Sequence, residues 1–298
     1  MPDTINAETQ EPASISLKKK SQAGEIIRRF LQNKAGVLGL VIICILVFCA
    51  LFPEVAAPHN PIRQDLSNRF VPPSAGHPFG TDEFGRDVFS RVIHGARISL
   101  QIALVSVVIS CIIGVIIGCI SGYYGSIIDN ILMRGIDILM AIPVILLGMS
   151  IVAAFGQSIF NLILAIAIGS VAPYARLVRV SVLSVKEQEF IEAARATGAS
   201  DLRIILKYIL PNCLAPIIVQ ASLSVAFAIM MATGLSFLGL GVPPPTPEWG
   251  SMASAARLFI RDSWWLVTFP GLAIMASVFS FNLFGDGLRD ALDPKLKS

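Results

Sequence analysis

The chain has 298 residues, of which 54% are hydrophobic and only 14% are charged, and its mean hydropathy is +0.73. Soluble domains carry about 25% charged residues, so this composition excludes a soluble enzyme, a disordered chain and a small disulfide scaffold. A helix needs roughly 20 apolar residues to cross a bilayer, and such stretches recur along the sequence. The fold class predicted is therefore an all-α, polytopic membrane protein.

Charged residues divide the sequence into uncharged stretches that each match one membrane crossing. A membrane β-barrel would need short alternating segments instead, so helices are favoured. Pro143 is expected to kink the third crossing and Pro173 the fourth. The six predicted spans cover residues 36–53, 99–122, 135–155, 159–177, 212–238 and a stretch between Asp262 and Asp286.

The distribution of lysine and arginine predicts the orientation. Most of the 23 Lys and Arg residues fall in the two terminal tails and between the fourth and fifth spans, and basic residues favour the cytoplasmic side. Both termini are therefore expected in the cytoplasm. The organisation predicted is a cytoplasmic tail (1–34), a first span with an external loop (35–97), a five-helix transmembrane domain (98–290) and a cytoplasmic tail (291–298).

The second span carries Gly114, Gly118 and Gly122 at four-residue spacing. Residues four apart lie on one face of a helix, and small side chains there let a second helix approach closely. Glycine is common in membrane helices, but three in register favour a packing role.

Several functional sites are not found in the sequence. No predicted span has a charge at its centre, so no ion-coupling site is expected. His59, His77 and His94 all lie in the first external loop at spacings that predict no metal site. No catalytic residue is expected, and no GxxxxGK phosphate loop is present, so ATP would have to be bound by another subunit.

The internal segment 187–211 predicts a short helix, a turn and a second helix. Phe190, Ile191 and Ala194 fall on one face of the first helix. Gly198 is a natural end point because glycine adopts the left-handed conformation at low cost. The second helix would begin near Ser200 or Asp201. Such a knob could insert into a groove on a partner; the alternative is a helix lying on lipid headgroups, which the small alanines and acidic face disfavour.

Residues within this segment resemble the EAA motif of bacterial ABC-importer permeases. The matching residues are Glu192-Ala193-Ala194, then Gly198, then Leu210-Pro211. In that family the motif forms the coupling helix that docks on the ATPase subunit. The resemblance implies the fold of a type I ABC-importer permease and coupling contacts by Glu192, Ala193, Ala194 and Gly198, with Phe190 and Ile191 as apolar anchors.

Further segments resemble the C-type permease subunits of the dipeptide, oligopeptide and nickel transport family. They include the run from His77 to Asp87 in the external loop, the run from Pro247 to Gly250, and the run from Asn282 to Asp290. The resemblance extends from about residue 30 to the C-terminus and leaves the substrate open. Dipeptides, longer peptides, glutathione-like conjugates and metal chelates all remain candidates.

The resemblance implies a permease subunit of an ATP-driven importer in a bacterial inner membrane. Its expected partners are a second permease in a heterodimer, two cytoplasmic ATPases that bind ATP and Mg²⁺, and an external solute-binding protein. The chain itself is expected to be no enzyme, to hold no cofactor and to bind no nucleic acid. Asp82, Arg86 and Asp87 are candidates for contact with the binding protein or for capping the translocation path, with a loop clamped by internal ion pairs as the alternative.

The main rival is a secondary transporter or channel, which would work alone and need an ion site. A third possibility, an intramembrane enzyme, would need a nucleophile and a base within the bilayer, and no predicted span has a His or Lys at its centre.

Overall fold

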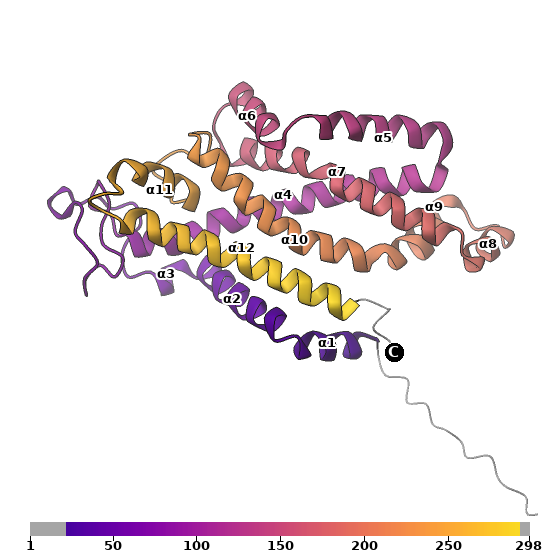
Figure 1. Ribbon diagram of the computed structural model, residues 1–298, viewed down its shortest axis with the longest axis horizontal. Helices are drawn as coiled ribbons and strands as arrows, with labels where there is room; N and C mark the ends of the chain where they lie inside the picture. The colour runs from indigo at the N-terminus through magenta and orange to yellow at the C-terminus, as the bar shows by residue number, and fades with distance from the viewer. Residues whose placement is uncertain (1–21, 293–298) are drawn as a thin grey trace, which may run out of the picture.

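The computed structural model describes residues 22–292, and all regular structure in this range is helical (Figure 1). This confirms the all-α prediction. Short helical turns occur at Leu66–Asn68 and Arg257–Phe259, and a π-helical turn, η2, covers Ile204–Ile209. The α-helices are α1 (Gln22–Gln32), α2 (Lys34–Leu51), α3 (Pro53–Ala56), α4 (Val88–Tyr124), α5 (Ser126–Ala141), α6 (Val144–Phe155), α7 (Ile159–Lys186), α8 (Glu189–Ala196), α9 (Asp201–Arg203), α10 (Leu210–Phe237), α11 (Trp249–Ala256) and α12 (Trp265–Leu292).

Five helices are long and apolar enough to cross a membrane: α2, α4, α7, the run from α9 through α10, and α12. The pair α5 and α6 passes the same test together, although it is bent by 87°. Counted as one crossing, this pair gives the six spans that the sequence predicts. The predicted tails 1–34 and 291–298 lie largely outside the described residues, but the first of them contains α1.

The bend between α5 and α6 lies at Pro143, as predicted. A residue before proline avoids the helical conformation, and Ile142 is extended, with φ −91° and ψ 123°. Pro143 then forms the N-terminal boundary of α6. Helix α7 continues through Pro173, and the kink expected there stays a prediction.

Helix α4 lies at the centre of the bundle and contacts α2, α7 and α10. Its three spaced glycines face α7, as the sequence predicts. A Cβ atom on Gly118 would lie 2.6 Å from the carbonyl oxygen of Ala175, and one on Gly122 would lie 2.9 Å from Cβ of Val182. Only glycine permits this separation, so the strip sets how closely α4 and α7 pack.

Helix α4 begins at Val88, eleven residues before the predicted second span. The charges of Arg91 and Arg97 mark the expected membrane boundary but do not end the helix, because Asp87 caps it further upstream. At a rise of 1.5 Å per residue, its 37 residues exceed the roughly 30 Å of a bilayer core. The irregular part of the external loop is therefore shorter than predicted.

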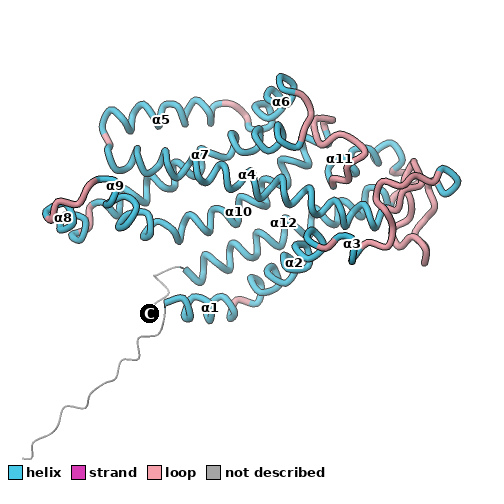
Figure 2. The backbone as a smooth tube through the Cα atoms, turned by 180° about the vertical axis from the view of Figure 1, so that it is seen from behind, coloured by secondary structure: helices cyan, strands magenta, loops and turns pink. Residues whose placement is uncertain are grey.

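The two ends of the long axis differ in character. In Figures 1 and 2, α8 and α9 form one end, while α3, α11 and the loop before α4 form the other. Helices α1 and α12 run side by side, and the side-chain amide of Asn33 donates to Asp290 Oδ2 at 2.9 Å. The described ends of the chain thus lie together, toward the α8 end.

Candidate functional site

Helix α8 forms within the segment where the sequence predicts a short helix, and it ends as predicted. Gly198 has φ +79°. The amide of Ala199 donates to the carbonyl of Ala194 at 3.1 Å, and the amide of Gly198 donates to that of Arg195 at 2.9 Å. This pair of bonds is a Schellman motif, which turns the chain sharply and needs a left-handed residue at Gly198.

The inner face of α8 attaches it to the rest of the chain. Ile191 is fully buried and Ala194 is 8% exposed. Both belong to an apolar cluster with Val178 and Val182 of α7 and Ile204 of η2. Ile191 and Ala194 therefore anchor α8 to its own chain, although the resemblance implied that they take part in docking.

Polar contacts attach the same region to the end of α4. The hydroxyl of Tyr123 donates to Asp201 Oδ1 at 2.7 Å, and the ammonium of Lys186 donates to the carbonyl of Gly122 at 3.0 Å. The guanidinium of Arg195 lies 5.4 Å from the centre of the Tyr123 ring. These contacts connect α8 and α9 to the end of α4, and the end of α7 to the end of α4.

The outer face of α8 is free of partners in the described part of the chain. Glu192 and Ala193 are exposed, Glu192 forms no ion pair with any described residue, and Phe190 keeps 44% of its surface exposed. Four of the six residues implied by the resemblance (Phe190, Glu192, Ala193 and Gly198) are thus exposed at one end of the molecule, and Ile191 and Ala194 support them from inside.

At the opposite end, the charged residues of the external loop point toward one another. Arg86 Nε donates to Asp82 Oδ2 at 2.6 Å, and Arg91 Nε lies 3.6 Å from the same oxygen. Asp82 and both arginines are each 6% exposed. Asp82 Oδ1 also accepts from the amides of Phe84 and Arg86 at 2.9 Å. The arrangement matches the alternative, a loop clamped by internal ion pairs, and direct contact by Asp82 and Arg86 stays a prediction.

The carboxylate of Asp87 also forms its bonds within the chain. Its Oδ2 accepts from the amide of Ser90 at 2.7 Å and from the Ser90 hydroxyl at 2.6 Å, and this caps α4. Its Oδ1 lies 2.9 Å from Nδ1 of His77. Nearby, Asn68 and the amide of Ser67 donate to Asp65, and these bonds lower the pKa of that carboxyl.

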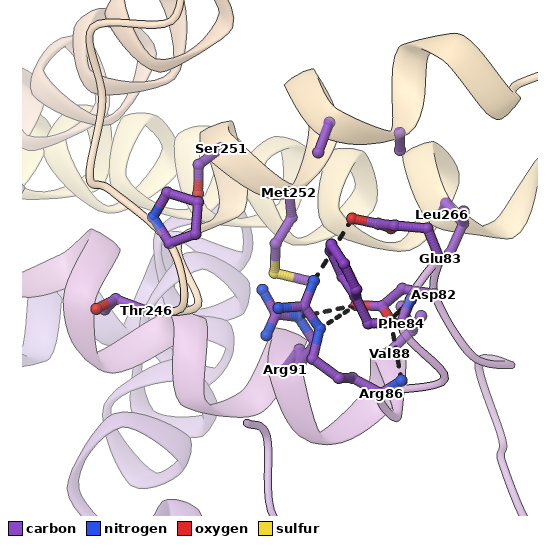
Figure 3. A pocket seen from close by; sticks show the side chains of 13 residues that line it. Asp82, Glu83, Phe84, Arg86, Val88, Arg91, Thr246, Ser251, Met252 and Leu266 are labelled. Carbon is purple, nitrogen blue, oxygen red and sulfur yellow. Dashed lines mark hydrogen bonds and ion pairs between the residues drawn. The ribbon is translucent and has the colours of Figure 1, made fainter. Parts of the chain in front are cut away.

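A cavity of about 150 Å³ adjoins this clamp, between the loop and the α11 region (Figure 3). Asp82, Arg86 and Arg91 line one side, and Met252 of α11 lies opposite. Arg91 also donates to the carbonyl of Pro61 at 2.9 Å. The cavity thus lies between the loop before α4 and the segment that contains α11.

Glu248 is a buried carboxylate that the sequence alone did not single out. It is 1% exposed and caps α11, accepting from the amides of Gly250 and Ser251 at 2.8 and 2.7 Å. The hydroxyl of Ser236 donates to it at 2.9 Å. The neighbouring Trp249 donates from its indole nitrogen to the carbonyl of Val92 at 2.9 Å. These bonds tie α11 to α10 and α4, so a structural role accounts for the Pro-Glu-Trp-Gly run.

Two pairs of opposite charges lie near the ends of the spans. Arg179 donates from Nε and Nη2 to Asp129 at 2.6 Å each, and Arg176 donates to Asp137 at 2.5 Å. Both pairs link α5 to α7. An arginine paired with an aspartate adds a contact between the two helices, and the absence of an ion-coupling site stays a prediction.

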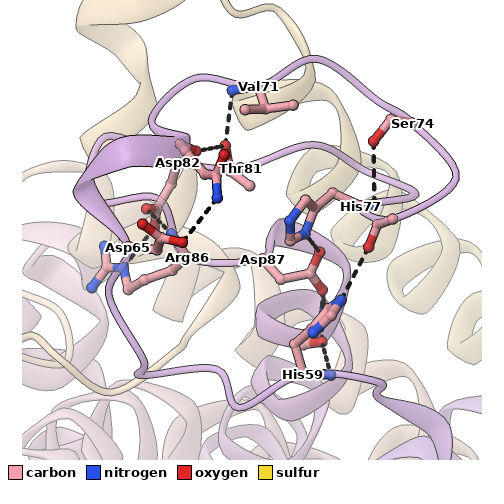
Figure 4. A network of polar contacts seen from close by, with 12 residues as sticks. His59, Asp65, Val71, Ser74, His77, Thr81, Asp82, Arg86 and Asp87 are labelled. Carbon is pink, nitrogen blue, oxygen red and sulfur yellow. Dashed lines mark hydrogen bonds and ion pairs between the residues drawn. The ribbon is translucent and has the colours of Figure 1, made fainter.

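The fold joins three residues that the sequence spacing separates. His59, His77 and Asp87 each offer a ligand atom within 4.8 Å of the others. The spacing predicted no metal site, because the residues come from three segments that only tertiary structure brings together (Figure 4).

Comparison with known proteins identifies the family. Residues 114–298 match the family described as "Binding-protein-dependent transport system inner membrane component", and residues 21–73 match "N-terminal TM domain of oligopeptide transport permease C". The chain is 47% identical to the di/tripeptide transport system permease protein DppC of Pseudomonas aeruginosa, over 99% of both chains. It is 49% identical to the dipeptide transport system permease protein DppC of Escherichia coli K12, over 90% of this chain and 91% of that one.

A solved structure shares the fold. The inward-facing MetNI methionine ABC transporter has a chain that superposes with a TM-score of 0.56 at 19% identity, over 68% of this chain and 96% of its own. The fold is therefore that of a type I ABC-importer permease. The chain belongs to the family of inner-membrane components of binding-protein-dependent transport systems.

Proposed function

We propose that this chain is the permease subunit of an ATP-driven importer of peptides, and that α8 couples it to separate ATPase subunits. The observation that carries the proposal is the exposed outer face of α8, which projects at one end of the molecule while its inner face is fixed to α4 and α7. A helix that is exposed on one side and anchored on the other can transmit a partner's movement to the spans.

ATP hydrolysis belongs to the partners in this proposal. Two cytoplasmic ATPases bind ATP and Mg²⁺, and their closure moves α8 and with it the spans. The two states need to differ by only a few kcal/mol for nucleotide to shift their populations. The chain holds no cofactor of its own and has no enzymatic role.

A second permease completes the path as a heterodimer, and an external binding protein delivers the solute. The exposed surface of the loop between α3 and α4 meets that binding protein. Asp82, Arg86 and Asp87 act by holding the shape of the loop. The names of the relatives support di- and tripeptides as the substrate class.

The orientation follows from the same arrangement. The described termini lie toward the α8 end, and that end carries the larger share of basic residues. By the positive-inside rule, both termini and α8 face the cytoplasm and the loop before α4 faces outward.

Two exposed phenylalanines offer a matched crosslinking test. Phe190 on α8 is 44% exposed and Phe84 in the loop is 40% exposed. Each is replaced by the photoreactive analogue benzoylphenylalanine in the complex with the partner subunits. Position 190 should crosslink to an ATPase subunit. Position 84 should crosslink to the binding protein and never to an ATPase.

Reconstitution tests the dependence on ATP. Proteoliposomes with both permeases, the ATPases and the binding protein should accumulate dipeptide only with ATP inside the compartment that holds the ATPases. Uptake by this chain alone, or crosslinking of position 190 to no ATPase, would refute the coupling role and favour a secondary transporter or channel.

A further inference from the structure

The residues His59, His77 and Asp87, called here the loop triad, come from three separate segments. His59 follows α3, His77 lies in the middle of the loop, and Asp87 caps the start of α4 (Figure 4). One ligand atom of each lies within 4.8 Å of the others, and the two imidazole rings are 5.0 Å apart.

Hydrogen bonds outside the triad fix the side chains in place. His59 Nε2 lies 3.0 Å from the carbonyl oxygen of Gly76. A carbonyl only accepts, so Nε2 carries the proton and the neutral ring leaves Nδ1 unprotonated. A bond from the second ring nitrogen to a backbone carbonyl is the usual way in which a metal-binding histidine is oriented.

Hydrogen bonds also fix the side chain of Asp87. Its Oδ2 is bonded to Ser90, whose hydroxyl oxygen accepts from the backbone amide of His59 at 3.1 Å. Its Oδ1 lies 2.9 Å from Nδ1 of His77. Capping of α4 accounts for the bonds of Oδ2, but it does not account for the position of His59 or His77 beside Asp87.

The triad is open to solution. His59 is exposed, His77 is half-buried and Asp87 is buried. All three line an open cavity of about 340 Å³. Arg63 and Asp65 also line it and carry opposite charges.

We propose that the loop triad binds one divalent transition-metal ion, of which Zn²⁺ is the best fit. Imidazole nitrogen with one carboxylate oxygen suits Zn²⁺, Ni²⁺ or Cu²⁺, whereas Mg²⁺ and Ca²⁺ prefer oxygen ligands throughout. Three protein ligands leave one position of a tetrahedral site to water. Zinc binding displaces a proton from the His77–Asp87 pair and ties the start of the loop to α4.

The test uses the full-length chain in detergent with a purification tag that lacks histidine, after treatment with a chelator. Zn²⁺ is titrated in competition with a chromogenic chelator, and Co²⁺ is added separately to record its visible absorption. The wild-type chain should bind one ion with saturation. His59→Ala and His77→Ala should each weaken binding by at least about 100-fold.

Two further variants separate ligation from folding. Asn caps helices as well as Asp, so Asp87→Asn should retain α4 while weakening Zn²⁺ binding. His94 lies in α4, outside the triad, and His94→Ala should bind as the wild type does. Thermal unfolding without metal checks that each variant is folded. If His77→Ala is not folded, the result for His59→Ala decides, because His59 is exposed.

Absence of saturable binding below millimolar Zn²⁺ would overturn the proposal. Equal affinity of His59→Ala and the wild type would do the same, because the bound ion would then lie elsewhere in the chain.

Discussion

The two ends of this permease use charged residues in opposite ways. At the α8 end, Glu192 is exposed and no described residue pairs with it, and the helix is held from inside by the apolar side chains of Ile191 and Ala194 and by the contact of Arg195 with the Tyr123 ring. At the loop end, Asp82, Arg86 and Asp87 are buried and bonded to their own chain. A charge left exposed and unpaired is available to a partner, whereas a buried and paired charge stabilises the fold.

This difference predicts an order of effects on stability and on uptake, which experiment can test. Substitutions at the loop end should cost the most folding stability, and substitutions on the outer face of α8 should cost the least. Loss of ATP-driven uptake in folded protein should instead be largest for substitutions in α8 and in the turn that ends it.

The largest loss of stability is expected for Asp82→Ala. It leaves the guanidiniums of Arg86 and Arg91 buried without their shared carboxylate, and breaking a buried ion pair costs about 3–5 kcal/mol. Denaturant unfolding in detergent measures the loss. Asp65→Ala, at an exposed carboxylate of the same loop, should lose far less; equal losses would show that the clamp is not what holds the loop.

The second expected effect concerns the helix contact that joins the two ends. A Cβ on Gly118 would lie 2.6 Å from a backbone carbonyl of α7, so Gly118→Ala should lower the free energy of unfolding by about 1–3 kcal/mol. Gly135 on α5 has no atom within 4 Å of such a Cβ. Gly135→Ala should therefore cost nothing, and a matching loss there would point to a general effect of glycine in these helices.

These residues show what sequence reasoning could reach. The glycine strip, the bend at Pro143 and the turn at Gly198 follow from local geometry, which a few neighbouring residues determine. The start of α4 was misplaced because charge marks a membrane boundary and not a helix end. The burial of Glu248 against Ser236 of α10 and the loop triad were not predicted, because both bring together residues of different segments and spacing along the chain does not report such proximity.

Gly198→Val should produce a moderate loss of stability and a complete loss of uptake. A left-handed conformation costs a residue with a side chain about 1–2 kcal/mol, and straightening the turn would move α8. Gly239 is the matched control, since its φ is +81°, its Cβ position is also open, and the amide of Leu240 donates to the carbonyl of Leu235 at 2.9 Å in the same motif. Gly239→Val should cost similar stability and leave coupling intact, as measured by dipeptide uptake per folded complex.

The smallest change in stability is expected for Glu192→Lys, within about 0.5 kcal/mol, because the side chain is exposed and unpaired. If Glu192 meets a basic group on the ATPase, reversal places like charges together, and uptake should fall by about tenfold or more. Glu54→Lys reverses an exposed charge at the opposite end and should leave uptake unchanged. A second reversal, of the basic residue on the ATPase, should restore uptake to Glu192→Lys, since that recovery requires the two side chains to touch. Wild-type uptake by Glu192→Lys alone would mean that docking relies on Phe190 and Ala193, and the exposed carboxylate would lose its assigned role.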